Sequence, residues 1–177
     1  MIYIVEVFSG EEFNILNRIK NELDDSIILD SYVPMKVIKK KYLGEWHNDL
    51  FIAFPGYIFI ESSDGVKLYY EIKKLYTFIK LLGVSKNKKE VESLSTEEEE
   101  FIYHLLGKDS KYIINSSDAL IKENKIVEVL SGPLKGFEGK ISRVNLHKRT
   151  ATILVNIMNR EIEMELSINL IREIQLF

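Results

Sequence analysis

The chain has 177 residues, of which 46% are hydrophobic and 29% are charged, and its formal net charge is −3. This length allows one domain or two small ones, and the composition supports a hydrophobic core and excludes wholesale disorder. Because the sequence contains no cysteine, disulfides, thiolate metal sites, iron–sulfur clusters and cysteine nucleophiles are excluded. The weakly acidic balance argues against a protein that coats nucleic acid without specificity, and it leaves room for a local basic patch.

The sequence also bears on location. Its N-terminal residues lack the basic start and the cleavage site of a signal peptide, and no apolar run approaches the roughly 20 residues that span a bilayer. We therefore expect a cytoplasmic protein without a membrane segment.

Strand and helix patterns alternate in the first part of the chain. Residues 2–8 are an apolar, β-branched run that predicts a strand buried on both faces, and Ser9 with Glu12 has the spacing of a capping box at a helix start. The helix is expected to end before Asp24. Its predicted apolar stripe consists of Phe13, Leu16, Ile19 and Leu23.

A long β-hairpin is predicted next, with strands over residues 32–41 and 50–60 and a polar tip over residues 44–49. Asp64 can cap a second helix, and residues 77–82 predict a short strand. The helical spacing there involves Val66, Tyr69, Ile72, Lys73 and Tyr76. Ser95 and Thr96 begin a third helix, and Gly107 is its left-handed stop.

The second part of the chain has a different pattern. Residues 108–119 are polar and weakly patterned, which predicts a linker. Five short strand-like runs follow, at residues 126–130, 137–144, 150–157, 161–166 and 170–174. Regular short strands predict a small β-barrel. The expected fold class is therefore α+β, with an N-terminal α/β sandwich (residues 1–107), a linker (108–119) and a C-terminal SH3-like barrel (120–177).

The first informative motif is Phe54-Pro55-Gly56-Tyr57, which lies within an apolar run. Proline fixes φ and glycine tolerates a positive φ, so this pair breaks a strand ladder and re-aims the flanking aromatic side chains. An ordinary turn is the competing interpretation of this motif alone.

The second motif follows the strand run at residues 126–130. Its turn residues are Gly132, Pro133, Gly136 and Gly139, and they provide the tight corners that an SH3-like barrel needs. Their spacing matches the KOW motif of ribosomal proteins and transcription elongation factors.

In this order and at this separation, the two motifs make the chain resemble the NusG family of bacterial transcription factors over nearly its full length. Residues 2–7, 32–34 and 95–98 are similar to other segments of that family. Ile2 and Ala53 depart from it, since the family usually has aromatic residues at both positions. Residues 44–47 and 146–151 are more similar to the specialised paralogues called LoaP than to general NusG proteins.

The resemblance implies a factor that binds RNA polymerase through its first domain and suppresses pausing and termination. The implied contact surface surrounds Phe54, Pro55, Gly56 and Tyr57, and we add three aromatic residues, Tyr3, Tyr76 and Phe78. An exposed aromatic patch rimmed by charge is what an interface hot spot needs. The competing interpretation, strongest for Tyr3 and Phe78, is that these side chains belong to the core.

The predicted hairpin carries basic and aromatic side chains that suit nucleic acid. They are Lys36, Lys39, Lys40, Lys41, Trp46 and His47. Similarity to LoaP implies that the partner is nascent RNA, in the form of a leader hairpin. Lys73 and Lys74, with Lys86, Lys88 and Lys89, are a second candidate patch. The competing interpretation is a solvated strand edge that discourages aggregation.

The resemblance further implies that the KOW domain recruits a ribosomal protein or a termination factor. Some family members refold this domain into helices, but residues 150–157 are rich in β-branched side chains, so we expect a permanent barrel here.

Nothing in the sequence indicates catalysis, because His47, His104 and His147 are far apart and no nucleotide-binding glycine loop occurs. We expect a monomer without catalytic residues, metal or cofactor. Two alternatives to a specialised antiterminator stay open: a general NusG elongation factor, and a ribosome-associated RNA-binding protein.

Overall fold

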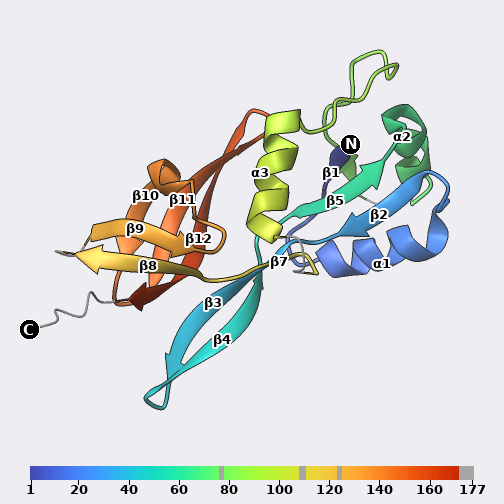
Figure 1. Cartoon of the computed structure of the whole chain (residues 1–177). Helices are drawn as coiled ribbons and strands as arrows, with labels where there is room; N and C mark the ends of the chain where they lie inside the picture. Colours follow the sequence, from blue (N-terminus) through green and yellow to red (C-terminus); the bar gives the residue numbers. More distant parts are fainter. Residues whose placement is uncertain (76–77, 108–110, 123–124, 172–177) are drawn as a thin grey trace, which may run out of the picture. The chain divides into compact units, whose positions relative to one another are not determined.

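The computed structural model describes residues 1–75, 78–107, 111–122 and 125–171 (Figure 1). The chain forms two compact units, one of residues 1–34 and 54–101 and the other of residues 35–53 and 102–177. An α+β fold was predicted, and this prediction is confirmed. Among the described residues, no helix has both the length and the hydropathy required to cross a membrane.

The first unit contains a four-stranded antiparallel sheet with the order β2-β5-β1-β6. Its elements are β1 (Ile2–Glu6), α1 (Glu12–Glu22), β2 (Ile28–Tyr32), β5 (Tyr57–Ser62), α2 (Gly65–Lys73) and β6 (Lys80–Leu81). The central strands β1 and β5 are almost completely buried, and α1 packs against β2 and β5 (Figure 1). The prediction that the first strand is buried on both faces is confirmed.

The predicted first helix exists, but it is rotated relative to the expected stripe. Glu12, Ile15 and Ile19 are its buried residues, while Phe13 is 51% exposed. The predicted capping box at Ser9 and Glu12 is wrong, because Glu11 is the N-cap residue and no side chain caps this helix. In α2 the predicted stripe is also shifted, and the buried apolar residues are Leu68 and Ile72.

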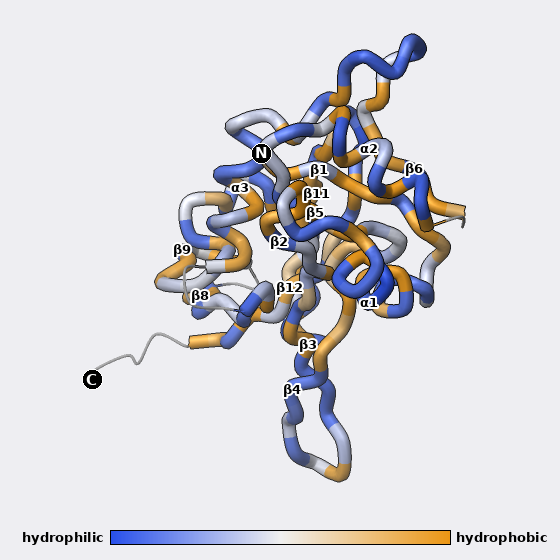
Figure 2. Tube along the Cα trace, turned by 90° about the vertical axis from the view of Figure 1, so that its right-hand side faces the viewer, coloured by the Kyte–Doolittle hydropathy of each residue, from blue (hydrophilic) through white to orange (hydrophobic). Residues whose placement is uncertain are grey.

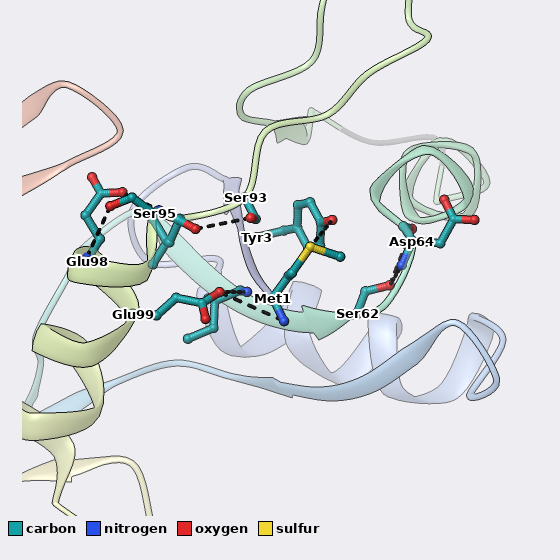
Figure 3. Close-up of polar contacts among 10 residues, drawn as sticks. Met1, Tyr3, Ser62, Asp64, Ser93, Ser95, Glu98 and Glu99 are labelled. Atoms are coloured by element: carbon teal, nitrogen blue, oxygen red, sulfur yellow. Dashed lines mark hydrogen bonds and ion pairs between the residues drawn. The ribbon is translucent and has the colours of Figure 1, made fainter.

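Three other helix signals are confirmed. The Asp64 carboxylate accepts a hydrogen bond from the Lys67 backbone N–H at 3.0 Å. In α3 (Thr96–Leu106) the side chains of Ser95 and Glu98 each accept a bond from the other's backbone N–H, which is a complete capping box (Figure 3). Gly107 has φ +70° and ends this helix.

Figure 3 also shows how the chain start is attached to α3. The Ile2 backbone N–H donates to Glu99, and the Met1 amino group lies 3.9 Å from the same carboxylate.

The second unit contains the hairpin, formed by β3 (Met35–Tyr42) and β4 (Glu45–Ile52), with β7 (Ile113–Ile114) parallel to β3. The hairpin itself was predicted, but its tip is shorter than residues 44–49. Leu43 and Gly44 both have positive φ and form a two-residue turn, so Trp46 and His47 lie within β4. Figure 2 shows that hydrophilic residues predominate along the outer half of the hairpin.

The second strand of the hairpin ends at Ile52 rather than at residue 60. The bend at residues 53–56 transfers the chain from β4 to β5, which belongs to the sheet of the first unit. Pro34 marks the corresponding break between β2 and β3, since proline cannot donate to a ladder.

The second unit also contains a five-stranded sheet with the order β10-β11-β12-β8-β9. Its strands are β8 (Ser117–Lys122), β9 (Lys125–Ser131), β10 (Ile141–Asn145), β11 (Thr150–Ile157) and β12 (Arg160–Ile171), and η1 (Glu138–Lys140) is a short 3₁₀ turn. β11 pairs with β12 along its whole length. The permanence of the barrel stays a prediction.

Three details of this unit differ from the predicted strands. β8 begins within the stretch that we interpreted as a linker, because the polar Ser117 is buried and its hydroxyl accepts a bond from the Leu134 N–H. Residues 138–140 form η1 rather than a strand. The predicted strands at residues 161–166 and 170–174 belong to one strand, β12, as far as Ile171, and residues 172–174 lie outside the described residues. The polar Asn169 of β12 donates to Asp118. The domain limits 1–107, 108–119 and 120–177 stay a prediction.

The KOW glycines have different structural roles. Gly132 has φ +90°, and a Cβ atom there would lie 2.7 Å from the Ser117 Cα. Gly136 has φ +84° in open space, whereas Gly139 has neither a positive φ nor a close neighbour. Pro133 is buried between them.

These differences predict a graded mutational series. Gly132→Ala should destabilise the protein by about 3 kcal/mol, because it adds a backbone clash to a strained φ. Gly136→Ala should cost about 1 kcal/mol through φ alone. Gly139→Ala, the matched control, should stay within about 0.5 kcal/mol of the parent. Urea denaturation measures all three, and equal losses at the three positions would contradict this assignment.

Candidate functional site

The Pro-Gly bend is fixed by backbone hydrogen bonds on both sides of Gly56. Its carbonyl accepts a bond from the Val7 N–H at 2.8 Å, and its N–H donates to Glu12 Oε1 at 2.7 Å. The Tyr57 N–H closes the turn onto the Phe54 carbonyl at 3.1 Å. Gly56 has φ +84°, a conformation that other residues rarely adopt.

Glu12 connects this bend to the first helix. Its side chain is buried, with 1% exposure, and its second oxygen, Oε2, accepts a bond from the Gly10 N–H at 2.7 Å. A buried carboxylate is tolerated when hydrogen bonds satisfy both of its oxygens. Glu12 therefore holds the Pro-Gly bend in place. Sequence reasoning missed this role, because Glu12 also has the spacing of a capping box with Ser9.

An exposed aromatic pair lies next to the bend. Phe8 is 64% exposed and Phe78 is 83% exposed, and their ring centroids are 5.8 Å apart. Phe8 directly follows Val7, which bonds to Gly56, and Pro55 is also exposed. We call Phe8, Pro55 and Phe78 the aromatic surface. Two phenylalanines that contact each other in solvent indicate an interaction site.

The predicted polymerase-contact residues do not all reach this surface. Phe78 and Pro55 belong to it, and Tyr57 is half-buried at the start of β5. Tyr3 is 2% exposed and Phe54 is 1% exposed, so both are core residues and do not belong to the surface. Tyr76 lies outside the described residues.

Core packing explains the position of the two buried aromatics. The Tyr3 ring lies over Gly65, where a Cβ atom would approach it to 2.6 Å, and burial raises the pKa of its hydroxyl. Phe54 packs on Phe59 with ring centroids 5.2 Å apart.

Phe8 was not predicted as a site residue. Its position at the end of the apolar run, directly before Ser9 and Gly10, was a signal that the sequence contained.

The hairpin lysines surround a groove in the second unit. The groove has a volume of about 700 Å³ and lies between the hairpin, the turn at residues 146–149 and β12. The residues that line it are Lys36, Ile38, Lys39, Lys40, Lys41, Trp46, Phe51, Ile52, His147, Lys148, Thr150 and Glu165. The backbone N–H of Lys39 also donates to Ser167 Oγ at 2.9 Å.

Two cations, Lys40 in the groove and Arg149 beside it, contact aromatic rings. Lys40 Nζ lies 4.3 Å from the centre of the Phe51 ring and 3.8 Å from an Asp49 oxygen. The Arg149 guanidinium carbon lies 4.2 Å from the centre of the Trp46 ring. Burial lowers the pKa of the half-buried Lys36, and the charge of Glu165 acts in the opposite direction.

The remaining residues that were predicted to bind nucleic acid, His47, Lys73 and Lys74, do not line the groove. His47 is exposed on β4, where its ring contacts Tyr42 at 6.4 Å, and it does not line the groove. Lys73 and Lys74 belong to the first unit, at the end of α2. Lys74 is paired with Glu71, and Lys73 lies over the Tyr69 ring at 5.5 Å. Within the described residues, no cluster of histidine, aspartate or glutamate could hold a metal ion.

Comparison with known proteins agrees with this architecture. A family model described as "Transcription termination factor nusG" matches residues 2–102, which is more than half of the chain, and a KOW motif model matches residues 123–156. This chain belongs to the NusG family. The sequence prediction of the family and of its KOW motif is confirmed.

Relatives and a solved structure extend this result over the full length. The transcription termination/antitermination protein NusG of Borreliella burgdorferi is 26% identical over 182 residues, covering 97% of each chain. The protein of the same name from Helicobacter pylori is 24% identical over 172 residues, covering 93% of each. A solved structure of Thermotoga maritima NusG has the same fold, with a TM-score of 0.58 and 18% identity over 94% of this chain and 92% of that one. The chain is a transcription termination/antitermination factor of the NusG family.

The buried carboxylate leads to a prediction about stability. In Glu12→Gln the amide nitrogen cannot accept a hydrogen bond, so either Gly56 or Gly10 loses its partner. The free energy of unfolding should fall by about 1–3 kcal/mol. Glu11→Gln, an exposed neighbour, is the matched control and should change it by less than about 0.5 kcal/mol. Urea denaturation that finds the two variants equally stable would show that the carboxylate does not hold the bend.

Proposed function

We propose that this NusG-family factor binds RNA polymerase through the aromatic surface and suppresses pausing and termination. The observation that carries the proposal is the solvent-exposed contact between Phe8 and Phe78 beside the fixed Pro-Gly bend. Large aromatic side chains supply most of the binding energy at protein interfaces when a partner removes them from water. Because Glu12 holds the bend in place, little conformational entropy is lost on binding.

We further propose that the factor is specialised to particular operons through an RNA leader signal, as in LoaP. The similarity of residues 44–47 and 146–151 to that paralogue supports this, and so does the position of both segments at the groove or beside it. A general NusG factor would act on all genes without a leader. A ribosome-associated RNA-binding protein is disfavoured by the family match over residues 2–102, because a KOW barrel alone would serve that role.

Under this proposal the partners follow from the two units. RNA polymerase contacts the aromatic surface and nascent RNA contacts the lysines of the hairpin, with Lys73 and Lys74 as a second basic patch. A ribosomal protein or a termination factor contacts the KOW domain. The protein acts in the cytoplasm as a monomer, without a cofactor and without catalysis.

Removal of an exposed aromatic side chain should weaken polymerase binding without unfolding the protein. Phe78→Ala and Phe8→Ala should each lower the affinity for purified RNA polymerase roughly tenfold or more, as hot-spot truncations do. Tyr70→Ala removes a ring that is 58% exposed on α2, outside the aromatic surface, and should leave the affinity unchanged. Fluorescence anisotropy of labelled protein measures all three. Equal effects of Tyr70→Ala and Phe78→Ala would contradict the proposed surface.

Charge reversal in the hairpin should weaken RNA binding. Replacement of Lys39, Lys40 and Lys41 by Glu should lower the affinity for a leader RNA by more than roughly tenfold at moderate salt, because cation–phosphate contacts are lost and repulsion replaces them. The salt dependence of binding should also become shallower. The same charge change at Lys20, Lys122 and Lys135 is the control, and filter binding at several salt concentrations measures both. An unchanged affinity in the hairpin variant would contradict this assignment.

A further inference from the structure

We propose that the groove of the second unit is a slot for an unpaired nucleotide, whose base stacks on Trp46 and whose phosphate is neutralised by the surrounding lysines. The inference rests on the proposed nucleic-acid role of the hairpin. It adds a defined site, a contribution from the barrel turn, and a preference for single strands.

The first observation is the platform for the base. Trp46 is half-buried in β4, and the flat guanidinium of Arg149 lies 4.2 Å from the centre of its ring. Arg149 has φ +55°, so the turn holds it in a conformation that arginine rarely adopts. Arg149 thus covers one face of the indole and holds the ring in place, and a splayed-out base stacks on the other face.

The second observation is the charge of the groove. Lys36, Lys39, Lys40, Lys41 and Lys148 line it, and Glu165 is the acidic residue that the lining contains. Such an excess of cations around a concave site favours a phosphodiester. Burial lowers the pKa of Lys36, and the charge of Glu165 only partly offsets this effect.

The third observation is the combination of shape and apolar floor. Ile38, Phe51 and Ile52 contribute apolar surface to the groove. A volume of about 700 Å³ falls within the range of sites that enclose small molecules, so it accommodates a nucleotide. In a duplex the bases are already stacked and their faces are covered, so Trp46 can act only on an unpaired base. Unpaired bases of RNA and of single-stranded DNA can both stack on Trp46 in this way.

Trp46 is the only tryptophan of the chain, so its fluorescence reports directly on the groove. The full-length protein is titrated with octanucleotides of single-stranded RNA, with the same sequences as DNA, with a blunt duplex, and with heparin, a polyanion without bases. Single strands should quench the fluorescence saturably, and duplex and heparin should not. Stronger quenching by RNA than by DNA identifies RNA as the ligand, and the reverse order identifies DNA.

Variants then test the individual contacts by the anisotropy of labelled octanucleotides. Trp46→Leu should lower the affinity roughly fivefold or more, since base stacking contributes on that scale. Arg149→Gln should lower it as well, because a cation beside the groove and the support of the Trp46 ring are both lost. Lys36→Gln should lower it and reduce the salt dependence. Lys135→Gln removes one exposed charge elsewhere on the barrel, as a matched control, and should not change the affinity. Circular dichroism confirms that each variant is folded.

These measurements distinguish an error in the nucleotide-slot proposal from an error in the proposed nucleic-acid role of the hairpin. If anisotropy reports binding while Trp46 is not quenched, or if Trp46→Leu binds normally, the slot is wrong and the hairpin role stands. Equal quenching by duplex or heparin also overturns the slot, because neither offers an unpaired base. If neither signal detects binding, both proposals fail.

Discussion

The hydrogen bond between the Glu12 carboxylate and the Gly56 N–H is the contact on which the arrangement of the chain depends. The apolar run from β4 into β5 would form one continuous strand without an interruption. The Pro-Gly bend supplies this interruption. Hydrogen bonds from Gly56 to Glu12 and from Val7 to Gly56 hold Gly56 at its positive φ. As a result β4 pairs with β3 in the hairpin, while β5 becomes a central strand of the other sheet.

The same contact explains why an exposed aromatic surface can persist beside the bend. Phe8 and Pro55 extend from backbone that is hydrogen-bonded at its neighbours Val7 and Gly56, so their exposure does not come from local disorder. Tyr3 and Phe54, by contrast, are core residues. In the proposed interface, a backbone that hydrogen bonds already hold in place loses little conformational entropy when a partner binds.

Much of this structure could be predicted from local signals. The order of elements, the caps at Asp64 and Ser95, the stop at Gly107 and the KOW corner all follow from short-range stereochemistry.

The errors in prediction arose where tertiary contacts override the local sequence pattern. Glu12 binds a residue that is 44 positions away instead of capping its helix. The first residues of β8 were interpreted as part of a linker, because the polar Ser117 has its partner, Leu134, far along the chain. The groove could not be predicted from the sequence for the same reason, since its lining residues Trp46 and His147 are far apart in the chain.

The most direct test of the account is transcription by purified RNA polymerase on a long template rich in pauses, with and without this protein and with and without a matching leader RNA. We expect the protein to raise read-through several-fold, with the increase confined to templates that encode the leader. Read-through on every template would replace the specialised role with that of a general elongation factor. If polymerase behaves identically with and without the protein, the central claim that this NusG-family chain acts on RNA polymerase is contradicted.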